Sequence, residues 1–235
     1  MKFNYIILLA IILAVVSCKK DNYKAPGTTL SGRLMYKGDS VGVEYNQVPF
    51  NIYQPGFGKT GAITGTFAPD GSYSILTFDG NYRFTIPPAQ GPFLWKELTA
   101  SARDTVKITL NGSQTYNIEV TPYYMIRNLK TSVTPGVVTA NFSIEQVITD
   151  PALAKSIQTV SLYINKTVFV SEGNNENIAK FDLAGTAITS LSNITLNVTV
   201  PTLSPIQNYV YARVGIKITG VEDLMFSPLR RITLK

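Results

Sequence analysis

The chain has 235 residues, enough for one large domain or two of ordinary size, and only 15% of them are charged. Its formal net charge of +6 comes from 21 basic and 15 acidic residues without the dense basic stripe that nucleic-acid binding requires. The chain has no histidine and one cysteine, which excludes Ser-His-Asp catalysis, histidine-containing zinc sites and an intramolecular disulfide.

The first 18 residues predict an exported lipoprotein. A basic start at Met1-Lys2 precedes an apolar run from Tyr5 to Val16, which is shorter than the ~20 residues of a bilayer-spanning helix. The run ends in Val15-Val16-Ser17-Cys18, which resembles the bacterial lipobox. This resemblance implies a signal peptide over residues 1–17, a lipid on Cys18 and a tether over residues 18–29. The alternative is an ordinary signal peptide with a chance cysteine.

Residues 30–122 contain short segments in which apolar and polar residues alternate, at 30–36, 48–52, 73–77, 82–86, 106–110 and 116–120. Such alternation places one face of a strand on a core and the other in water. Asp70-Gly71, Asp79-Gly80 and Asn111-Gly112 lie between these segments and suit tight turns, because they tolerate positive φ. We therefore expect an antiparallel β-sandwich.

The order of motifs in this half resembles the prealbumin (transthyretin-like), or carboxypeptidase-regulatory-like, sandwich. The resemblance is carried by TLSGRLMYKG at 29–38, VPFNIYQPG at 48–56, DGSYSI at 70–75 and DGNYRFTIPP at 79–88. It covers about 95 residues and implies the same fold.

A second series of alternating segments occupies residues 123–235. It follows Thr121-Pro122, where proline cannot donate to a β ladder, and includes 138–144, 160–164, 194–200, 210–218 and 229–234. Asp150-Pro151, followed by Leu153 and Ile157, predicts one short helix between strands. We expect a second sandwich that packs independently and shares no sheet with the first.

The string Leu203-Ser-Pro205-Ile-Gln-Asn-Tyr209 resembles the one that opens the penultimate strand of fibronectin type III and immunoglobulin-like sandwiches. The resemblance implies that fold for residues 123–235. It also implies that Tyr209 is a structural corner residue, whose hydroxyl bonds to backbone.

The whole arrangement resembles a family of two-domain Bacteroidetes surface lipoproteins of unknown function, associated with polysaccharide-utilisation loci. The resemblance implies a lipid-anchored protein of the outer membrane, at the cell surface or on the periplasmic face. It also implies glycan handling, with oligosaccharide and neighbouring glycan importers as partners.

The sequence offers little catalytic chemistry. Gly56-Phe57-Gly58-Lys59-Thr60 lacks the spacing of a phosphate-binding loop. Asp70, Asp79 and Asp223 lie in predicted turns, where carboxylates accept hydrogen bonds from backbone amides. No carboxylate pair is marked as catalytic, and no cluster of oxygen ligands suggests calcium. We expect a protein that is not an enzyme and that holds no cofactor or metal.

Aromatic residues outside the strand alternation are the candidate ligand contacts. Phe57 lies between flexible glycines, and Phe93 and Trp95 follow the proline-rich bend at 87–92. An exposed ring suits the apolar face of a pyranose, so we expect Trp95 to bind saccharide, helped by Phe93 and Phe57. Gln90 and Lys96 are the expected polar contacts. The alternative is that Trp95 caps the first sandwich or packs between the domains.

Two functions remain open from the sequence. The first is a glycan-binding accessory protein on the cell surface. The second is a structural or adhesin-like envelope protein, for which an unpaired strand edge would be the expected contact.

Overall fold

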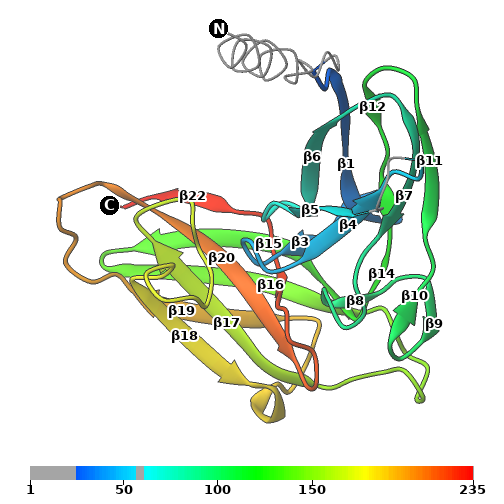
Figure 1. The fold of residues 1–235 in the computed structure, drawn as a ribbon. Helices are drawn as coiled ribbons and strands as arrows, with labels where there is room; N and C mark the ends of the chain where they lie inside the picture. The colour runs from blue at the N-terminus through cyan, green and yellow to red at the C-terminus, as the bar shows by residue number, and fades with distance from the viewer. Residues whose placement is uncertain (1–24, 57–60, 235) are drawn as a thin grey trace, which may run out of the picture.

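The computed structural model describes residues 25–56 and 61–234, which form an all-β protein with one short 3-10 helix, η1 (Gly185–Ala187). Figure 1 shows two β units: the blue-to-green first half of the chain and the light-green-to-red second half. The predicted all-β class with two sandwiches is confirmed. No helix within the described residues is long and apolar enough to cross a membrane.

The first sandwich is built around its first strand, β1 (Thr28–Tyr36). β1 pairs antiparallel with β6 (Ser72–Thr77) and β2 (Asp39–Ser40), and parallel with β12 (Gln114–Thr115) and β13 (Ile118–Glu119). The expectation of a purely antiparallel sandwich is wrong at these parallel pairs. They form because the chain crosses the other sheet before it returns beside β1, as a parallel pair requires.

The opposing sheet has the order β11-β7-β4-β5. Its strands are β4 (Pro49–Tyr53), β5 (Ala62–Thr66), β7 (Gly80–Thr85) and β11 (Val106–Leu110). Two short pairs flank it, β8 (Phe93–Leu94) with β14 (Thr121–Pro122) and β9 (Glu97–Thr99) with β10 (Ala102–Arg103). The core between the sheets contains a cluster of aromatic rings: the ring of Phe50 lies 5.1 Å from Phe84 and 5.2 Å from Tyr73.

The chain bends at the predicted Asp70-Gly71 and Asn111-Gly112, but Gly80 is the first residue of β7 and Asp79-Gly80 joins strands of different sheets. Gly71 and Gly112 have φ of +79° and +84°, which L-residues rarely adopt. The carboxylate of Asp70 accepts a hydrogen bond from the backbone N–H of Ser72 at 3.1 Å. Asp70 therefore stabilises its own turn, as the sequence suggests. Asp79 instead accepts a hydrogen bond from the distant backbone N–H of Gly112, at 2.8 Å.

The second sandwich has a sheet of order β15-β16-β19 facing one in which β17 and β20 are central. Their bounds are β15 (Tyr124–Thr134), β16 (Val137–Gln146), β17 (Ile157–Asn165), β18 (Ala179–Ala184), β19 (Ile194–Thr199), β20 (Tyr209–Ile218) and β22 (Arg230–Thr233). Alternate residues of β16 and β19 are buried, as the alternation predicts. The core is mainly aliphatic, in contrast to the first.

The predicted helix after Asp150 is wrong, because the chain forms a single turn there. Asp150 accepts hydrogen bonds from the backbone N–H of Leu153 and Ala154, and its side chain accepts one from Ala152 at 2.9 Å. β17 begins at Ile157, so the segment after Asp150 is too short for helical hydrogen bonds to offset the free-energy cost of helix nucleation.

The implied role of Tyr209 also differs. Its ring lies 4.0 Å from the guanidinium of Arg231 and edge-on to Tyr211. Its hydroxyl has no hydrogen-bond partner among the residues that the structure describes, so it does not fix a corner between sheets.

The two sandwiches share a sheet. β3 (Gly42–Val43) of the first half pairs antiparallel with β21 (Met225–Phe226) of the second, and β21 pairs with β20. The expectation of two sandwiches without a common sheet is therefore wrong. β20 pairs with one edge of β21, which leaves the backbone groups of the other edge available. Any short extended segment that reaches such an edge can pair with it, and here β3 does so. A Cβ on Gly42 would lie 2.4 Å from the carbonyl oxygen of Phe226, so this approach depends on glycine.

Side chains extend this junction. The buried carboxylate of Asp223 accepts a hydrogen bond from the backbone N–H of Gly91 at 2.6 Å, and burial raises the pKa of Asp223. Ser171 donates to Glu44 at 2.8 Å, and Arg127 forms an ion pair with Asp39. The hydrophobic core is continuous across both halves.

Candidate functional site

A groove lies between the two sandwiches, beside the β3–β21 pair. Its volume of about 390 Å³ falls in the range of small-molecule sites, ~300–1,000 Å³. The lining is predominantly apolar and comes from both halves: Arg33, Ser40, Gly42, Tyr45, Pro69 and Asp70 from the first, and Val168, Phe169, Arg213, Ser227, Pro228 and Leu229 from the second. We call this the interdomain groove.

Two exposed aromatic rings form one wall of the interdomain groove. The rings of Tyr45 and Phe169 meet edge-on with centroids 4.9 Å apart, and the residues are 42% and 45% exposed. Val168 and Leu229 are also exposed beside them. Large apolar side chains gathered on a surface and not covered by the fold mark a binding surface more often than isolated ones.

Local structure holds each ring in place. Tyr45 is separated from β3 by Glu44 alone, so the β3–β21 pairing holds it at the domain junction. Phe169 lies in the loop between β17 and β18. The side-chain amide of Asn165, at the end of β17, donates to the carbonyls of Phe169 at 2.6 Å and Asn175 at 3.3 Å, which closes that loop over β17.

Arg213 forms the floor of the interdomain groove and is only 3% exposed. Its guanidinium lies 4.4 Å from the ring of Phe226 and donates to three carbonyl groups: Ser227 at 2.9 Å, Pro69 at 2.8 Å and Val43 at 3.3 Å. Burial lowers the pKa of Arg213 to about 10, although Asp70 and Glu44 oppose that shift. Because two acceptors belong to the first half and one to the second, Arg213 fastens the groove walls together.

Arg33 and Asp70 form an ion pair of 3.1 Å at the rim of the groove, and both side chains are about half exposed. Burial alone would raise the pKa of Asp70, but hydrogen bonds from Ser72 and the charge of Arg33 outweigh it, so the pKa lies below its ordinary value. The pair therefore presents a charged donor and a charged acceptor to any ligand in the groove.

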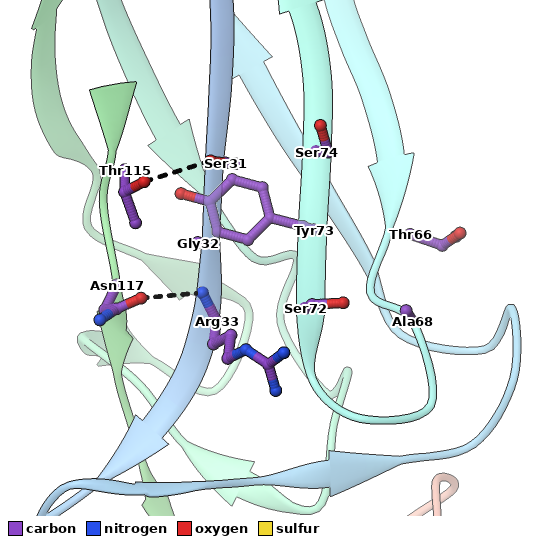
Figure 2. Close-up of a pocket in the computed structure, with 10 residues that line it drawn as sticks. All are labelled: Ser31, Gly32, Arg33, Thr66, Ala68, Ser72, Tyr73, Ser74, Thr115 and Asn117. Atoms are coloured by element: carbon purple, nitrogen blue, oxygen red, sulfur yellow. Dashed lines mark hydrogen bonds between the residues drawn. The ribbon is translucent and has the colours of Figure 1, made fainter. Parts of the chain in front are cut away.

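Arg33 also belongs to a second hollow, of about 640 Å³, on the outer side of the β1 sheet. Figure 2 shows Thr115 and Asn117 on one side of β1, and β6 on the other, with Thr66 and Ala68 beyond it. Outward side chains of β1, β6 and β12, with Asn117 just after β12, make a surface that we call the polar face: Ser31, Arg33, Ser72, Ser74, Thr115 and Asn117.

Gly32, between Ser31 and Arg33 on β1, leaves room for Tyr73 beneath the polar face. A Cβ on Gly32 would lie 2.0 Å from the carbonyl oxygen of Tyr116 and 2.9 Å from the ring of Tyr73. Tyr73 lies across Gly32 on the core side and donates its hydroxyl to Tyr116 at 2.6 Å. Burial is the main cause of a raised pKa for Tyr73, so the hydroxyl remains a donor.

The aromatic platform expected from the sequence is not an exposed surface. Trp95 and Phe93 are 4% and 1% exposed, and the indole lies edge-on to Phe84 at 6.3 Å. The expectation of exposed rings at these positions is wrong, because the β8–β14 pair covers the loop and turns both side chains into the first core. The alternative, that Trp95 caps the first sandwich, describes what is seen.

Gln90 and Lys96 do not line the groove. Gln90 is half-buried and its carbonyl accepts from Arg103 at 3.2 Å, while Lys96 is exposed at a residue with φ of +45°. Phe57 and the lipidation candidate Cys18 lie outside the described residues. No group of three acidic, cysteine or histidine side chains suited to a metal ion occurs in residues 25–56 and 61–234.

Sequence reasoning missed Tyr45 and Phe169. Both lie in segments without strand alternation, as Phe93 and Trp95 do. That position outside the alternation was the one feature of the sequence that could have marked them as candidate ligand contacts. Their proximity depends on the β3–β21 pairing, which no local pattern predicts.

Two family models match the chain. Residues 28–121 match the N-terminal domain of a protein of unknown function (DUF3823), and residues 124–231 match the domain of unknown function DUF3823_C. No curated protein sequence is significantly similar to the chain.

Solved structures of similar proteins cover both halves. A DUF3823 family protein from Parabacteroides merdae is 30% identical, covers 89% of this chain and 100% of its own, and gives a TM-score of 0.75. One from Bacteroides ovatus is 28% identical with the same coverage and TM-score. A protein from Bacteroides uniformis described as a candidate carbohydrate binding protein is 19% identical, again covers 89% and 100%, and gives a TM-score of 0.66.

Proposed function

The chain belongs to the DUF3823 family, a two-domain family of unknown function, and on this basis we propose that it is a non-catalytic protein that binds saccharide in the interdomain groove. The observation that carries the proposal is the exposed edge-on pair of Tyr45 and Phe169 beside the ion pair of Arg33 and Asp70.

This combination matches the chemistry of a sugar ring. A pyranose has apolar C–H faces that pack on aromatic rings, and hydroxyls around its edge that both donate and accept hydrogen bonds. The ring pair supplies the apolar contact. The guanidinium of Arg33 supplies donors, and the carboxylate of Asp70 supplies acceptors. The description of the Bacteroides uniformis neighbour as a candidate carbohydrate binding protein supports the same assignment.

The acid chemistry of the groove supports binding without hydrolysis. Glycoside hydrolysis uses two carboxyl groups across the scissile bond, one of which must carry a proton. Asp70 is the one carboxylate among the described residues that line the groove, and its pKa is lowered. Glu44, the nearby carboxyl whose pKa burial raises, is itself buried against Ser171.

Calorimetry on the purified protein tests the proposal, with cello-, xylo-, manno- and malto-oligosaccharides as probes. We expect a Kd in the roughly micromolar-to-millimolar range, because a shallow site spends much of its contact energy on ordering ligand and side chains. Phe169→Ala and Tyr45→Ala should each weaken binding by about tenfold.

Phe181→Ala is the matched control. Phe181 is exposed by 45%, the same fraction as Phe169, but it lies on β18 and does not line the groove. Equal loss of affinity in the Phe181 and Phe169 variants, or no loss in either groove variant, would contradict the proposal.

We further propose that the protein is anchored by a lipid on Cys18 in the outer membrane, at the cell surface, where it would serve a neighbouring glycan importer. The lipobox-like string at residues 15–18 supports the anchor. The test is fractionation of cells that express Cys18→Ser, which should release the protein or leave an uncleaved precursor. Normal processing and unchanged membrane association would contradict the anchor without affecting saccharide binding.

A further inference from the structure

We propose that the interdomain groove and the polar face form one continuous site, and that its ligand is therefore an oligosaccharide of several units rather than a single sugar. This inference rests on the proposed function and extends it. The juxtaposition that carries it is Arg33, whose side chain lines both hollows.

The register of the strands arranges the polar face in two rows. Ser31 lies opposite Ser74 on β6 and opposite Thr115 on β12, which makes the first row. Arg33 lies opposite Ser72, and its backbone N–H donates to the side-chain oxygen of Asn117 at 3.1 Å, which makes the second row. Two residues along β1 separate the rows by ~6.6 Å.

The second row adjoins the groove, because Arg33 pairs with Asp70 at its rim. The first row lies one step further from Tyr45 and Phe169. Only a ligand longer than one sugar ring can therefore touch both the ring pair and the first row.

The polar face has hydrogen-bonding capacity that the protein does not use. The hydroxyl of Ser74 and the side-chain nitrogen of Asn117 have no hydrogen-bond partner among the described residues, and Ser31 and Thr115 are joined only by a long contact of 3.4 Å. Ser74, Thr115 and Asn117 are exposed, Ser31 is partly exposed, and each lies on a strand or, for Asn117, between two short strands. A chain of sugar hydroxyls could therefore contact them without rearrangement.

The two parts of the site should act differently. The aromatic groove provides the apolar contact that any bound unit needs. The polar face adds hydrogen bonds to the ligand, which replace hydrogen bonds to water, so their net contribution to the binding free energy is modest. Loss of these bonds should weaken binding by about threefold to tenfold.

The test compares affinity against oligosaccharide length, from one to six units, for the series that the wild type binds. The informative variant is Ser74→Ala combined with Asn117→Asp. The aspartate keeps the acceptor for the N–H of Arg33 but removes the free side-chain donor. The control is Thr139→Ala with Asn197→Asp, which likewise removes one hydroxyl and one amide on the outer face of β16 and β19, where the two side chains bond to each other at 2.8 Å.

We expect the affinity of the wild type to rise with length before it levels off. The polar-face variant should lose about threefold to tenfold for the longer ligands and less for a single sugar, because Ser74 lies in the more distant row, while Phe169→Ala weakens binding at every length. Affinity that does not increase with length, or a polar-face variant that matches the wild type at every length, would overturn the continuous site and leave the groove proposal standing. No binding by the wild type at any length would overturn both.

Discussion

Two groups of aromatic residues lie outside the strand alternation, and the fold treats them in opposite ways. Phe93 and Trp95 are drawn into the first core, because β8 pairs with β14 and places the indole against Phe84. Tyr45 and Phe169 come from loops of different sandwiches and remain about half exposed where those sandwiches meet. An irregular segment therefore says little about exposure. What decides it is whether another part of the fold covers the segment.

Truncation of the buried ring gives the largest difference between the groups. Trp95→Ala should lower the free energy of unfolding by about 3–5 kcal/mol, because it leaves a cavity beside Phe84, whereas Phe169→Ala should cost less than about 1 kcal/mol. Urea unfolding followed by circular dichroism measures both, since Trp95 is the only tryptophan and its loss removes indole fluorescence. A Trp95→Ala variant as stable as Phe169→Ala would break the comparison.

How tightly the ring of Phe93 is packed can be tested with a substitution at Gly91. Gly91 has φ of +82°, and a Cβ there would lie 2.3 Å from the ring of Phe93. Gly91→Ala should therefore cost about 2–4 kcal/mol from backbone strain and displacement of the ring. Gly112→Ala is the control, because Gly112 has φ of +84° with no atom within 4 Å of the added Cβ, so it should show the strain alone, about 1 kcal/mol. Equal losses of unfolding free energy in the two variants would mean that the ring of Phe93 is not tightly packed against Gly91.

The exposed pair should show only weak mutual stabilisation. A double-mutant cycle with Tyr45→Ala and Phe169→Ala should give a coupling free energy near the lower end of the ~0.5–1.5 kcal/mol known for aromatic pairs, because both rings are half exposed to water. Thermal unfolding of the four proteins measures it. Strict additivity would show that the two loops do not hold the rings together in solution.

The smallest effect concerns the carboxyl of Glu44, beside Tyr45. Burial raises the pKa of Glu44, against an opposing hydrogen bond from Ser171, so the folded state binds its proton more tightly than the unfolded chain does. That contribution to stability is present below the unfolded pKa and is lost as the pH rises through the folded pKa.

Glu44→Gln should therefore match the wild type in acid and exceed its unfolding free energy at neutral pH, by less than about 1 kcal/mol. The urea midpoints of both proteins at about pH 3.5 and about pH 8 give the comparison. The contributions of the other titratable groups are the same in both proteins and cancel in the difference between them. A glutamine variant that is less stable at neutral pH would show that ionised Glu44 is needed at the junction.

Much of the fold was predictable because its strands bury one face. β16 and β19 match the alternation in the sequence closely, whereas β20 also buries Arg213 and Gly215. β5 was missed because it is an exposed edge strand, with Ile63 among its exposed residues, and carries no alternating apolar face. β3 could not be predicted, because a two-residue strand has no period and forms only where β21 offers an edge.

The candidate site was harder to predict than the fold for the same reason. Trp95 and Phe93 were predicted as ligand contacts from their position outside the strand alternation, a position that Tyr45 and Phe169 share. Only tertiary contacts separate the buried rings from the exposed ones. The Asp-Gly turn at Asp70 was predictable from local chemistry, but its place between two hollows depends on Arg33 and on the second sandwich.

The shared β3–β21 strand pair also bears on how such a protein can change by recombination. A replacement for either sandwich would have to supply the matching edge, a glycine at the position of Gly42 and the acceptors of Arg213. Without them the remaining half would keep an unsatisfied edge and a buried guanidinium. The two halves are thus inherited most safely as one unit, and the solved relatives from Parabacteroides merdae and Bacteroides ovatus align with this chain over their full length.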